Sequence, residues 1–257
     1  MWRMFRDARI LGIVGVLFFV AVITILNSTV YSPEATVMRY LNALEDRRQA
    51  DVESLVWGDS GSLAYDIRVP ADPADRPHSI RVSKVSHTGD SAIVLVAYEL
   101  GGATRTTTFG MRKEPSWAPL SDWRFAVAPF ATVTLDSKPT APFGVNGSLP
   151  GETGATYVPV IARVASGTTW FDADPVAISA TNPAAVYVAS LTFTPTAQLD
   201  SAINTKVREY LDSCAAQKTL VPKKCPFAGF TAQRISAGPL WTIEKYPVIE
   251  ISESDGE

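Results

Sequence analysis

The stretch that decides the fold of this chain reads Ser-Pro-Glu-Ala-Thr-Val-Met-Arg-Tyr-Leu-Asn-Ala-Leu, residues 32–44. Ser32 is a favoured N-cap, Pro33 suits the first helical position, and Glu34 lies where the helix dipole favours negative charge. Apolar residues then recur every three or four positions, which is the period of one helix face. These positions are Val37, Tyr40, Leu41 and Leu44, and Val52, Leu55 and Val56 continue the stripe. The pattern predicts an amphipathic helix that packs on a core.

Strands are predicted after this helix. A proline-rich loop occupies residues 70–77, and segments with strand-like alternation follow it. We expect these strands at about 80–86, 91–100, 104–112 and 123–128, separated by His-Thr-Gly-Asp and Gly-Gly turns. A helical segment followed by antiparallel strands predicts an α+β module over residues 31–130.

Residues 131–195 contain only strand and turn signals. Residues 131–136 alternate between apolar and polar, and Val145-Asn146-Gly147-Ser148 is a strong hairpin turn. Further strands are expected at 157–164, 176–180 and 184–194. The segment therefore predicts a small β-sandwich.

A second α+β module is predicted over residues 196–257. Glu-Tyr-Leu-Asp-Ser-Cys (209–214) aligns with Arg-Tyr-Leu-Asn-Ala-Leu (39–44), and residues 248–257 mirror the strand and turn at 80–90, so a strand is expected from residue 248. The apolar positions of its helix are Ile203, Val207, Tyr210 and Leu211. Asp255-Gly256 would be a hairpin turn without a return strand. We therefore expect this module to be incomplete, either because the chain is a piece of a longer protein, which is the favoured expectation, or because another molecule donates the missing strand.

The N-terminus predicts a membrane anchor. Residues 1–9 carry three arginines, and the run from Ile10 to Leu26 contains no charged residue and one hydroxyl. Basic residues that flank a membrane helix tend to remain in the cytoplasm. We therefore expect residues 1–9 in the cytoplasm, residues 10–30 in the membrane and the rest outside the cell. A cleaved signal peptide is the alternative, but no Ala-x-Ala-like site follows Leu26, and Pro33 follows the only suitable small residue, so we expect an uncleaved signal-anchor.

The two cysteines, Cys214 and Cys225, are expected to form a disulfide. They lie in a turn-rich segment of a chain predicted to reach an oxidising compartment. A zinc site would need two more ligands, and the only histidines, His78 and His87, are more than 120 residues upstream. The metal interpretation is therefore rejected.

No catalytic set can be assembled from the sequence. The chain lacks the motifs of nucleophile elbows, zinc proteases, P-loops and dinucleotide sites. We interpret both histidines as exposed loop residues. The acids nearest to the predicted strand ends are interpreted as solvated, and two tryptophans are interpreted as packing residues. The acids are Asp59, Asp66 and Glu99, and the tryptophans are Trp117 and Trp123. Asn27 and Asn146 match the glycosylation sequon, but one is too close to the membrane and the other is explained by its turn. No catalytic, cofactor-binding or metal-binding residue is therefore predicted.

The charge balance limits the partners. The chain has 23 Lys+Arg and 26 Asp+Glu, a net charge of −3. Because residues 1–9 contribute two net positive charges, the remainder has a net charge of −5. This acidity argues against nucleic acid and anionic lipid as main partners of the ectodomain.

Three resemblances follow from these element orders. Residues 32–130 resemble the cystatin-like and nuclear-transport-factor-2-like cone folds of bacterial envelope proteins, and residues 131–195 resemble PEGA-type and other Ig-like surface modules. The order of cone, sandwich and cone, with Leu-Asp-Ser-Cys-Ala followed by Cys-Pro-Phe, is similar to a class of uncharacterised single-pass bacterial surface proteins.

The expected function is that of a non-enzymatic, membrane-anchored extracellular binding or assembly protein of the bacterial envelope. Its expected partners are the lipid bilayer and other envelope proteins. Two alternatives stay open: a small-molecule-binding or weakly enzymatic pocket in the first cone module, and a mechanical spacer. The ligand, the biological process and the oligomeric state are not predicted.

Overall fold

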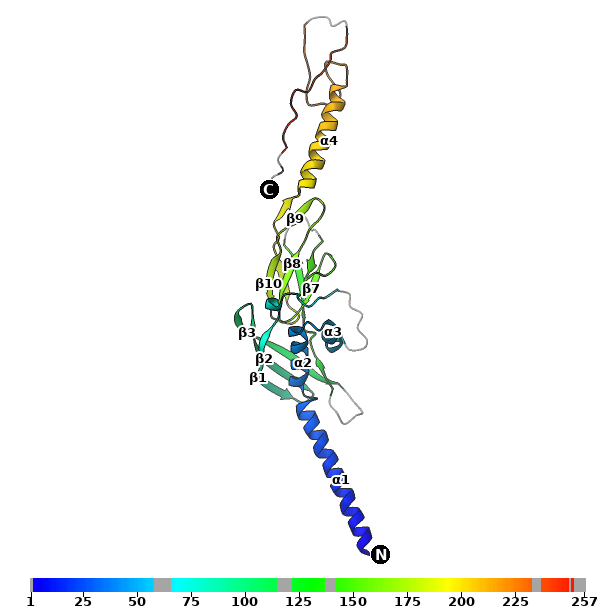
Figure 1. Cartoon of the computed structure of the whole chain (residues 1–257), viewed down its shortest axis with the longest axis vertical. Coiled ribbons are helices and arrows are strands. Elements are labelled where there is room, and N and C mark those ends of the chain that lie inside the picture. The colour runs from blue at the N-terminus through cyan, green and yellow to red at the C-terminus, as the bar shows by residue number, and fades with distance from the viewer. Residues whose placement is uncertain are drawn as a thin grey trace. The chain divides into compact units, whose positions relative to one another are not determined.

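The computed structural model describes residues 2–57, 66–114, 122–136, 142–232, 237–249 and 251, with side chains from residue 16 onward (Figure 1). Within this part the chain is α+β, with four α-helices and several antiparallel sheets, as predicted. It divides into two compact units. Unit 1 contains Met1–Ser166 and Pro175–Leu191, and unit 2 contains Gly167–Asp174 and Thr192–Glu257.

Helix α1 (Trp2–Thr29) includes the whole predicted apolar run. Its described side chains are largely exposed, with exposed fractions of 63% for Val16 and 71% for Phe18. Among the described residues no single helix meets the length and apolarity needed to cross a membrane. The segments Val16–Thr29 and Pro33–Glu45 meet them only as a pair, bent by 47° at the break between them.

Helix α2 (Pro33–Glu45) begins at the predicted cap. The Ser32 hydroxyl accepts a hydrogen bond from the Ala35 amide at 3.2 Å, and helix α3 (Gln49–Trp57) follows after a short turn. The predicted stripe is divided between the two helices: Val37, Tyr40, Leu41, Leu44 and Val52 are completely buried, whereas Leu55 and Val56 are partly buried.

Four antiparallel strands form the first sheet, in the order of the chain. They are β1 (His78–Thr88), β2 (Ser91–Leu100), β3 (Ala103–Glu114) and β4 (Asp122–Phe125). Helix α2 packs on this sheet, and the Tyr40 ring lies 5.1 Å from the Phe125 ring and 6.1 Å from the Phe109 ring. Aromatic side chains therefore fill the space between the helix and the sheet.

The remaining strands of unit 1 form two three-stranded sheets. One contains β5 (Phe130–Leu135), β7 (Gly154–Tyr157) and β11 (Val186–Ala189), and the other contains β6 (Gly144–Val145), β8 (Val160–Ala165) and β10 (Val176–Ala180). Asn146 and Gly147 have φ of 54° and 79° in the predicted turn, and the Ser148 amide donates to the Val145 carbonyl. Strand β11 pairs with β5 in parallel, which the sequence analysis did not predict.

The strands after residue 130 share a core with the helices before it. Tyr157 and Val160 belong to the same buried cluster as Tyr40. The Arg163 guanidinium on β8 bonds the Asp75 carboxylate, which ends the short 3₁₀ helix η2 (Pro73–Asp75). Residues on both sides of the predicted module boundary thus contribute to one compact unit.

Unit 2 contains a two-stranded antiparallel sheet and one long helix. Strand β9 (Phe171–Ala173) pairs with β12 (Phe193–Pro195), and helix α4 (Ala197–Ala215) follows. The helix was predicted.

The strand predicted from residue 248 is not found among the described residues. The structure describes residues 237–249 and 251 without a strand. Leu240 and Val248 are 86% and 79% exposed, and no described strand pairs with this segment. The predicted Asp255-Gly256 turn lies outside the described residues.

Candidate functional site

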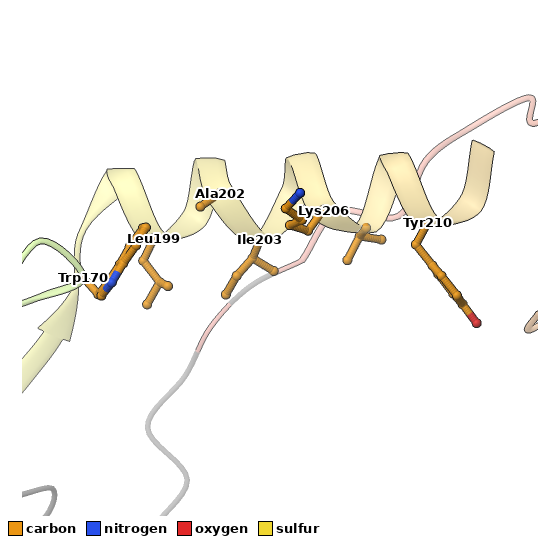
Figure 2. A pocket seen from close by; sticks show the side chains of 7 residues that line it. Trp170, Leu199, Ala202, Ile203, Lys206 and Tyr210 are labelled. Atoms are coloured by element: carbon orange, nitrogen blue, oxygen red, sulfur yellow. The ribbon is translucent and has the colours of Figure 1, made fainter. Parts of the chain in front are cut away.

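The candidate site is an apolar groove on one face of helix α4, with a volume of about 330 Å³ (Figure 2). Figure 2 shows Trp170 and Leu199 at one end and Tyr210 at the other. The groove is lined by Trp170, Leu199, Ala202, Ile203, Lys206, Val207 and Tyr210. All of these residues belong to unit 2.

The sequence of α4 creates this face by its spacing. Leu199, Ile203, Lys206 and Tyr210 are separated by four, three and four residues, so they share one side of a helix. The Thr196 hydroxyl caps the helix and accepts a hydrogen bond from the Leu199 amide at 3.3 Å. The apolar positions predicted for this helix were expected to pack on a sheet. In the structure Tyr210 is 47% exposed, and no sheet of the described residues covers this face.

Trp170 is held beside the start of the helix by backbone hydrogen bonds. The Thr196 amide donates to the Trp170 carbonyl at 3.0 Å, and the Thr196 hydroxyl donates to the Thr169 carbonyl at 2.8 Å. The Trp170 ring remains 43% exposed. Sequence analysis missed this residue, because a single tryptophan in a turn carries no periodic signal.

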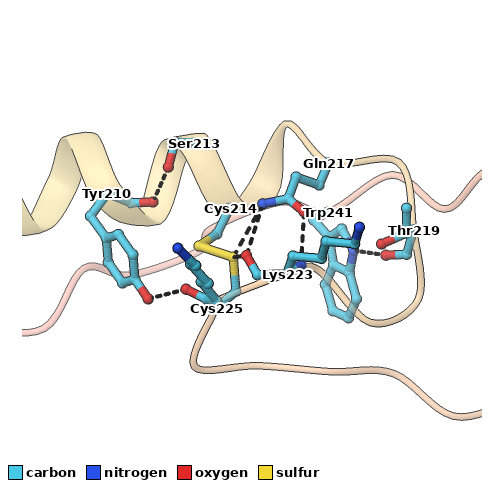
Figure 3. The surroundings of a disulfide bond; sticks show 9 residues. Tyr210, Ser213, Cys214, Gln217, Thr219, Lys223, Cys225 and Trp241 are labelled. Atoms are coloured by element: carbon cyan, nitrogen blue, oxygen red, sulfur yellow. Dashed lines mark hydrogen bonds between the residues drawn. A yellow bond between two sulfur atoms is a disulfide. The ribbon is translucent and has the colours of Figure 1, made fainter.

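The disulfide loop lies at the Tyr210 end of the groove (Figure 3). The predicted disulfide between Cys214 and Cys225 is confirmed. The Tyr210 hydroxyl donates to the Lys224 carbonyl, and the Gln217 side-chain oxygen accepts from the Lys223 amide at 2.8 Å. These bonds fix the two lysines next to the end of helix α4.

A second contact anchors the loop after the disulfide. The Trp241 indole donates to the Thr219 carbonyl at 2.8 Å, and its ring lies 4.9 Å from the Phe227 ring (Figure 3). The disulfide and this aromatic pair thus order a segment that has no regular secondary structure.

The returning chain contacts the back of α4 at Arg208 and Asp212. The Arg208 guanidinium lies 5.2 Å above the Tyr246 ring, whose hydroxyl bonds the Asp212 carboxylate. This bond raises the pKa of Tyr246. Arg208 and Asp212 are each two residues, or about 200° around the helix, from Tyr210. They therefore lie opposite the groove, which remains open in the described part of the chain.

The groove has opposite charges at its ends. Asp200 is exposed near Trp170, and Lys223 and Lys224 are exposed near Tyr210. Among the described residues none forms an ion pair with these three side chains. Lys206 instead pairs with Glu209 at 2.7 Å, which raises the pKa of Lys206. Its ammonium group therefore points along its own helix while its stem lines the groove.

The histidines considered in the sequence analysis are parts of strand β1 in the structure and not loop residues. The His78 ring nitrogens lie 3.2 Å from a Glu45 carboxylate oxygen and 2.7 Å from the Pro73 carbonyl. The His87 ring packs edge-on against Trp123 at 6.0 Å, and Trp123 itself is a core residue, as expected.

The acids considered in the sequence analysis do not converge on one site. The Asp66 carboxylate accepts hydrogen bonds from Arg68 and from the Leu149 amide, and the bond from Arg68 is the main reason that its pKa is lowered. Glu99 is exposed on β2. Asp59 and Trp117 lie outside the described residues.

Two further observations bear on a site. Among the described residues no three His, Cys, Asp or Glu side chains are grouped as metal ligands would be. Comparisons of the chain with protein-family models, with curated proteins and with solved structures find no significant match. Helix α1 and the α4 groove are therefore the features of the chain that bear on its function.

Proposed function

We propose that the chain is a non-enzymatic, single-pass membrane protein that binds other envelope proteins outside the cell. Helix α1 would be the anchor, spanning the bilayer with Ile10–Leu26. The groove on α4 would be the binding surface. Disulfide Cys214–Cys225, which suits an oxidising compartment, supports the extracellular placement of unit 2.

Anchoring is supported by the described half of α1. Most of its large apolar side chains are exposed and none belongs to a described core cluster, with exposed fractions of 61% for Phe19 and 60% for Ile25. Moving each such side chain out of water contributes about 1.5–3 kcal/mol. By the positive-inside rule, the arginines of residues 1–9 favour a cytoplasmic N-terminus.

Binding is carried by a single observation, the open apolar groove between Trp170 and Tyr210. Tryptophan and tyrosine are enriched in protein interfaces, because each buries a large area with few rotatable bonds. Both residues are nearly half exposed, Trp170 at 43% and Tyr210 at 47%. A mechanical spacer needs no such surface, so the groove favours binding over that alternative.

A photo-reactive phenylalanine analogue at position 210 of the full chain tests the binding function in cells. We expect adducts with envelope proteins or with the chain itself when the analogue replaces Tyr210. The matched control replaces Thr205, which is exposed on the far side of the same helix. Equal labelling at both positions, or none, would refute binding through the groove. Alkaline extraction of the same membranes should leave the chain in the pellet, and its release would refute the anchor.

A further inference from the structure

We propose that the partner of the α4 groove is the same groove of a second copy of this chain, with the two α4 helices antiparallel. This inference deepens the proposed binding function by naming the partner, and it rests on that function. An interface of this kind is two-fold symmetric, so each copy uses the same residues.

The shape of the groove fits its own two-fold copy. Leu199 and Tyr210 are about 16 Å apart along the helix axis, at the two ends of the groove. Antiparallel pairing places Leu199 opposite the second copy's Tyr210, and Ala202 opposite the second copy's Val207. Trp170, which extends the groove beyond Leu199, then covers the second copy's Tyr210 (Figure 2). Each exposed aromatic ring thus finds an apolar partner at the opposite end.

Charge selects the antiparallel direction. Asp200 and Cys214 are 14 residues apart, close to four helical turns, so Asp200 and the disulfide loop lie on the same flank of α4. In an antiparallel two-fold pair, this flank of one helix lies beside the same flank of the second helix. The N-terminal end of each helix is then next to the C-terminal end of the other. Asp200 then approaches the second copy's Lys223 and Lys224, and the same contact occurs twice. A parallel pair would instead place both Asp200 side chains at one end and all four lysines at the other, so no contact between Asp200 and these lysines would form.

The helix dipoles also favour the antiparallel pair. The positive N-terminal end of each α4 lies beside the negative C-terminal end of the other in an antiparallel pair. Lys206 does not oppose the pairing, because its ammonium group is bonded to Glu209 and only its stem lines the groove. Neither the charges nor the apolar side chains are left unmatched.

Cysteine cross-linking between two tagged full-length copies tests this pairing. One copy carries Leu199→Cys and the other carries Tyr210→Cys, and both are oxidised after co-expression and extraction in mild detergent. We expect a 199–210 linked heterodimer, identified by peptide mass, and little linkage when either variant is present alone. The control pair, Ser201→Cys with Thr205→Cys, lies on the far face and should not link. Homodimers linked 199–199 or 210–210, or no linkage above the control pair, would overturn the proposal.

A charge exchange gives a second readout that does not alter the apolar face. Asp200→Lys should lower the heterodimer yield about fivefold or more, because two ion pairs become repulsive. Adding Lys224→Asp should restore the yield. Lys224 has φ of 59°, a backbone conformation that aspartate tolerates well. An unchanged yield with Asp200→Lys would overturn the antiparallel arrangement.

These results separate the two proposals. If the analogue at position 210 captures a different envelope protein while the cysteine pair does not link, self-pairing is wrong and the binding function stands. If both experiments fail, the groove is not a binding surface. Because the linkage is measured in detergent, it does not depend on the orientation of α1.

Discussion

The hydroxyl oxygen of Tyr40 lies 2.7 Å from the carbonyl oxygen of Val158, 118 residues further along the chain. The same hydroxyl lies 2.9 Å from the Pro129 carbonyl. A hydroxyl has one proton, so it donates to one carbonyl at a time. Tyr40 is completely buried, and this bond ties helix α2 to the strands that follow residue 130.

Replacing Tyr40 with phenylalanine should lower the free energy of unfolding by about 1–3 kcal/mol, because the buried Val158 carbonyl loses the hydroxyl donor, whereas the Pro129 carbonyl keeps the Val158 amide. Thermal unfolding of the full chain in detergent, followed by near-ultraviolet circular dichroism, measures the change. Tyr31→Phe, at a partly exposed position, is the control and should have little effect. Equal stability of the two variants would show that the hydroxyl does not stabilise unit 1.

Alkaline pH should destabilise unit 1 through its buried tyrosines. Burial raises the pKa values of Tyr40, Tyr98 and Tyr157 above the usual value of about 10. Below that pH these groups are protonated in both states and their contribution to stability is complete. Above it the unfolded chain releases protons that the folded chain retains, so the free energy of unfolding falls as pH rises.

Absorbance at 295 nm measures this titration. Of the eight tyrosines, these three should ionise only when the near-ultraviolet signal of the folded state is lost. Ionisation of all eight near pH 10 in a folded protein would contradict the expectation.

The Asp75–Arg163 pair should matter more than surface ion pairs. The Asp75 side chain is 3% exposed, whereas both partners of the Arg124–Asp122 pair are about half exposed. Arg163→Met should therefore lower the melting temperature clearly more than Arg124→Met, because it leaves a buried carboxylate without its cation. Adding Asp75→Asn to Arg163→Met should recover part of the loss. If the two arginine variants had the same melting temperature, the buried pair would stabilise the protein no more than the surface pair does.

Removing the disulfide should loosen unit 2 and leave unit 1 unchanged. A loop of this length contributes about 3 kcal/mol in the chain-entropy account. In the Cys214→Ser/Cys225→Ser variant we expect faster hydrogen exchange in residues 216–232, and unchanged exchange in strands β2 and β3. Protection of the loop in the variant would show that the Trp241 and Gln217 contacts are sufficient without the bond.

The elements that sequence analysis predicted best are those with local signals. Ser32, Pro33 and the stripe from Val37 to Leu44 define helix α2 without any tertiary information, because a cap and a helical period are properties of neighbouring residues. The strands of the first sheet were predicted for the same reason, from alternation and from the turns between them. The short separation of Cys214 and Cys225 made their pairing a local inference too.

The features that sequence analysis missed depend on residues far apart in the chain. No local pattern indicates that the Tyr40 hydroxyl meets Val158, or that β11 lies parallel to β5. A strand was predicted from Val248 by its likeness to residues 80–90, but a strand forms only beside a partner. The groove was missed because its face on α4 was assigned to a core, and because Trp170 joins it from a turn.

The central claim is that the chain is anchored by α1 with the rest outside the cytoplasm, and labelling of its only two cysteines tests it most directly. Spheroplasts that express the full chain are treated with a membrane-impermeant reductant and then with a membrane-impermeant maleimide. The account predicts that Cys214 and Cys225 are labelled in intact spheroplasts, and only after reduction. Labelling that requires lysis of the spheroplasts, or that occurs without reduction, would contradict it.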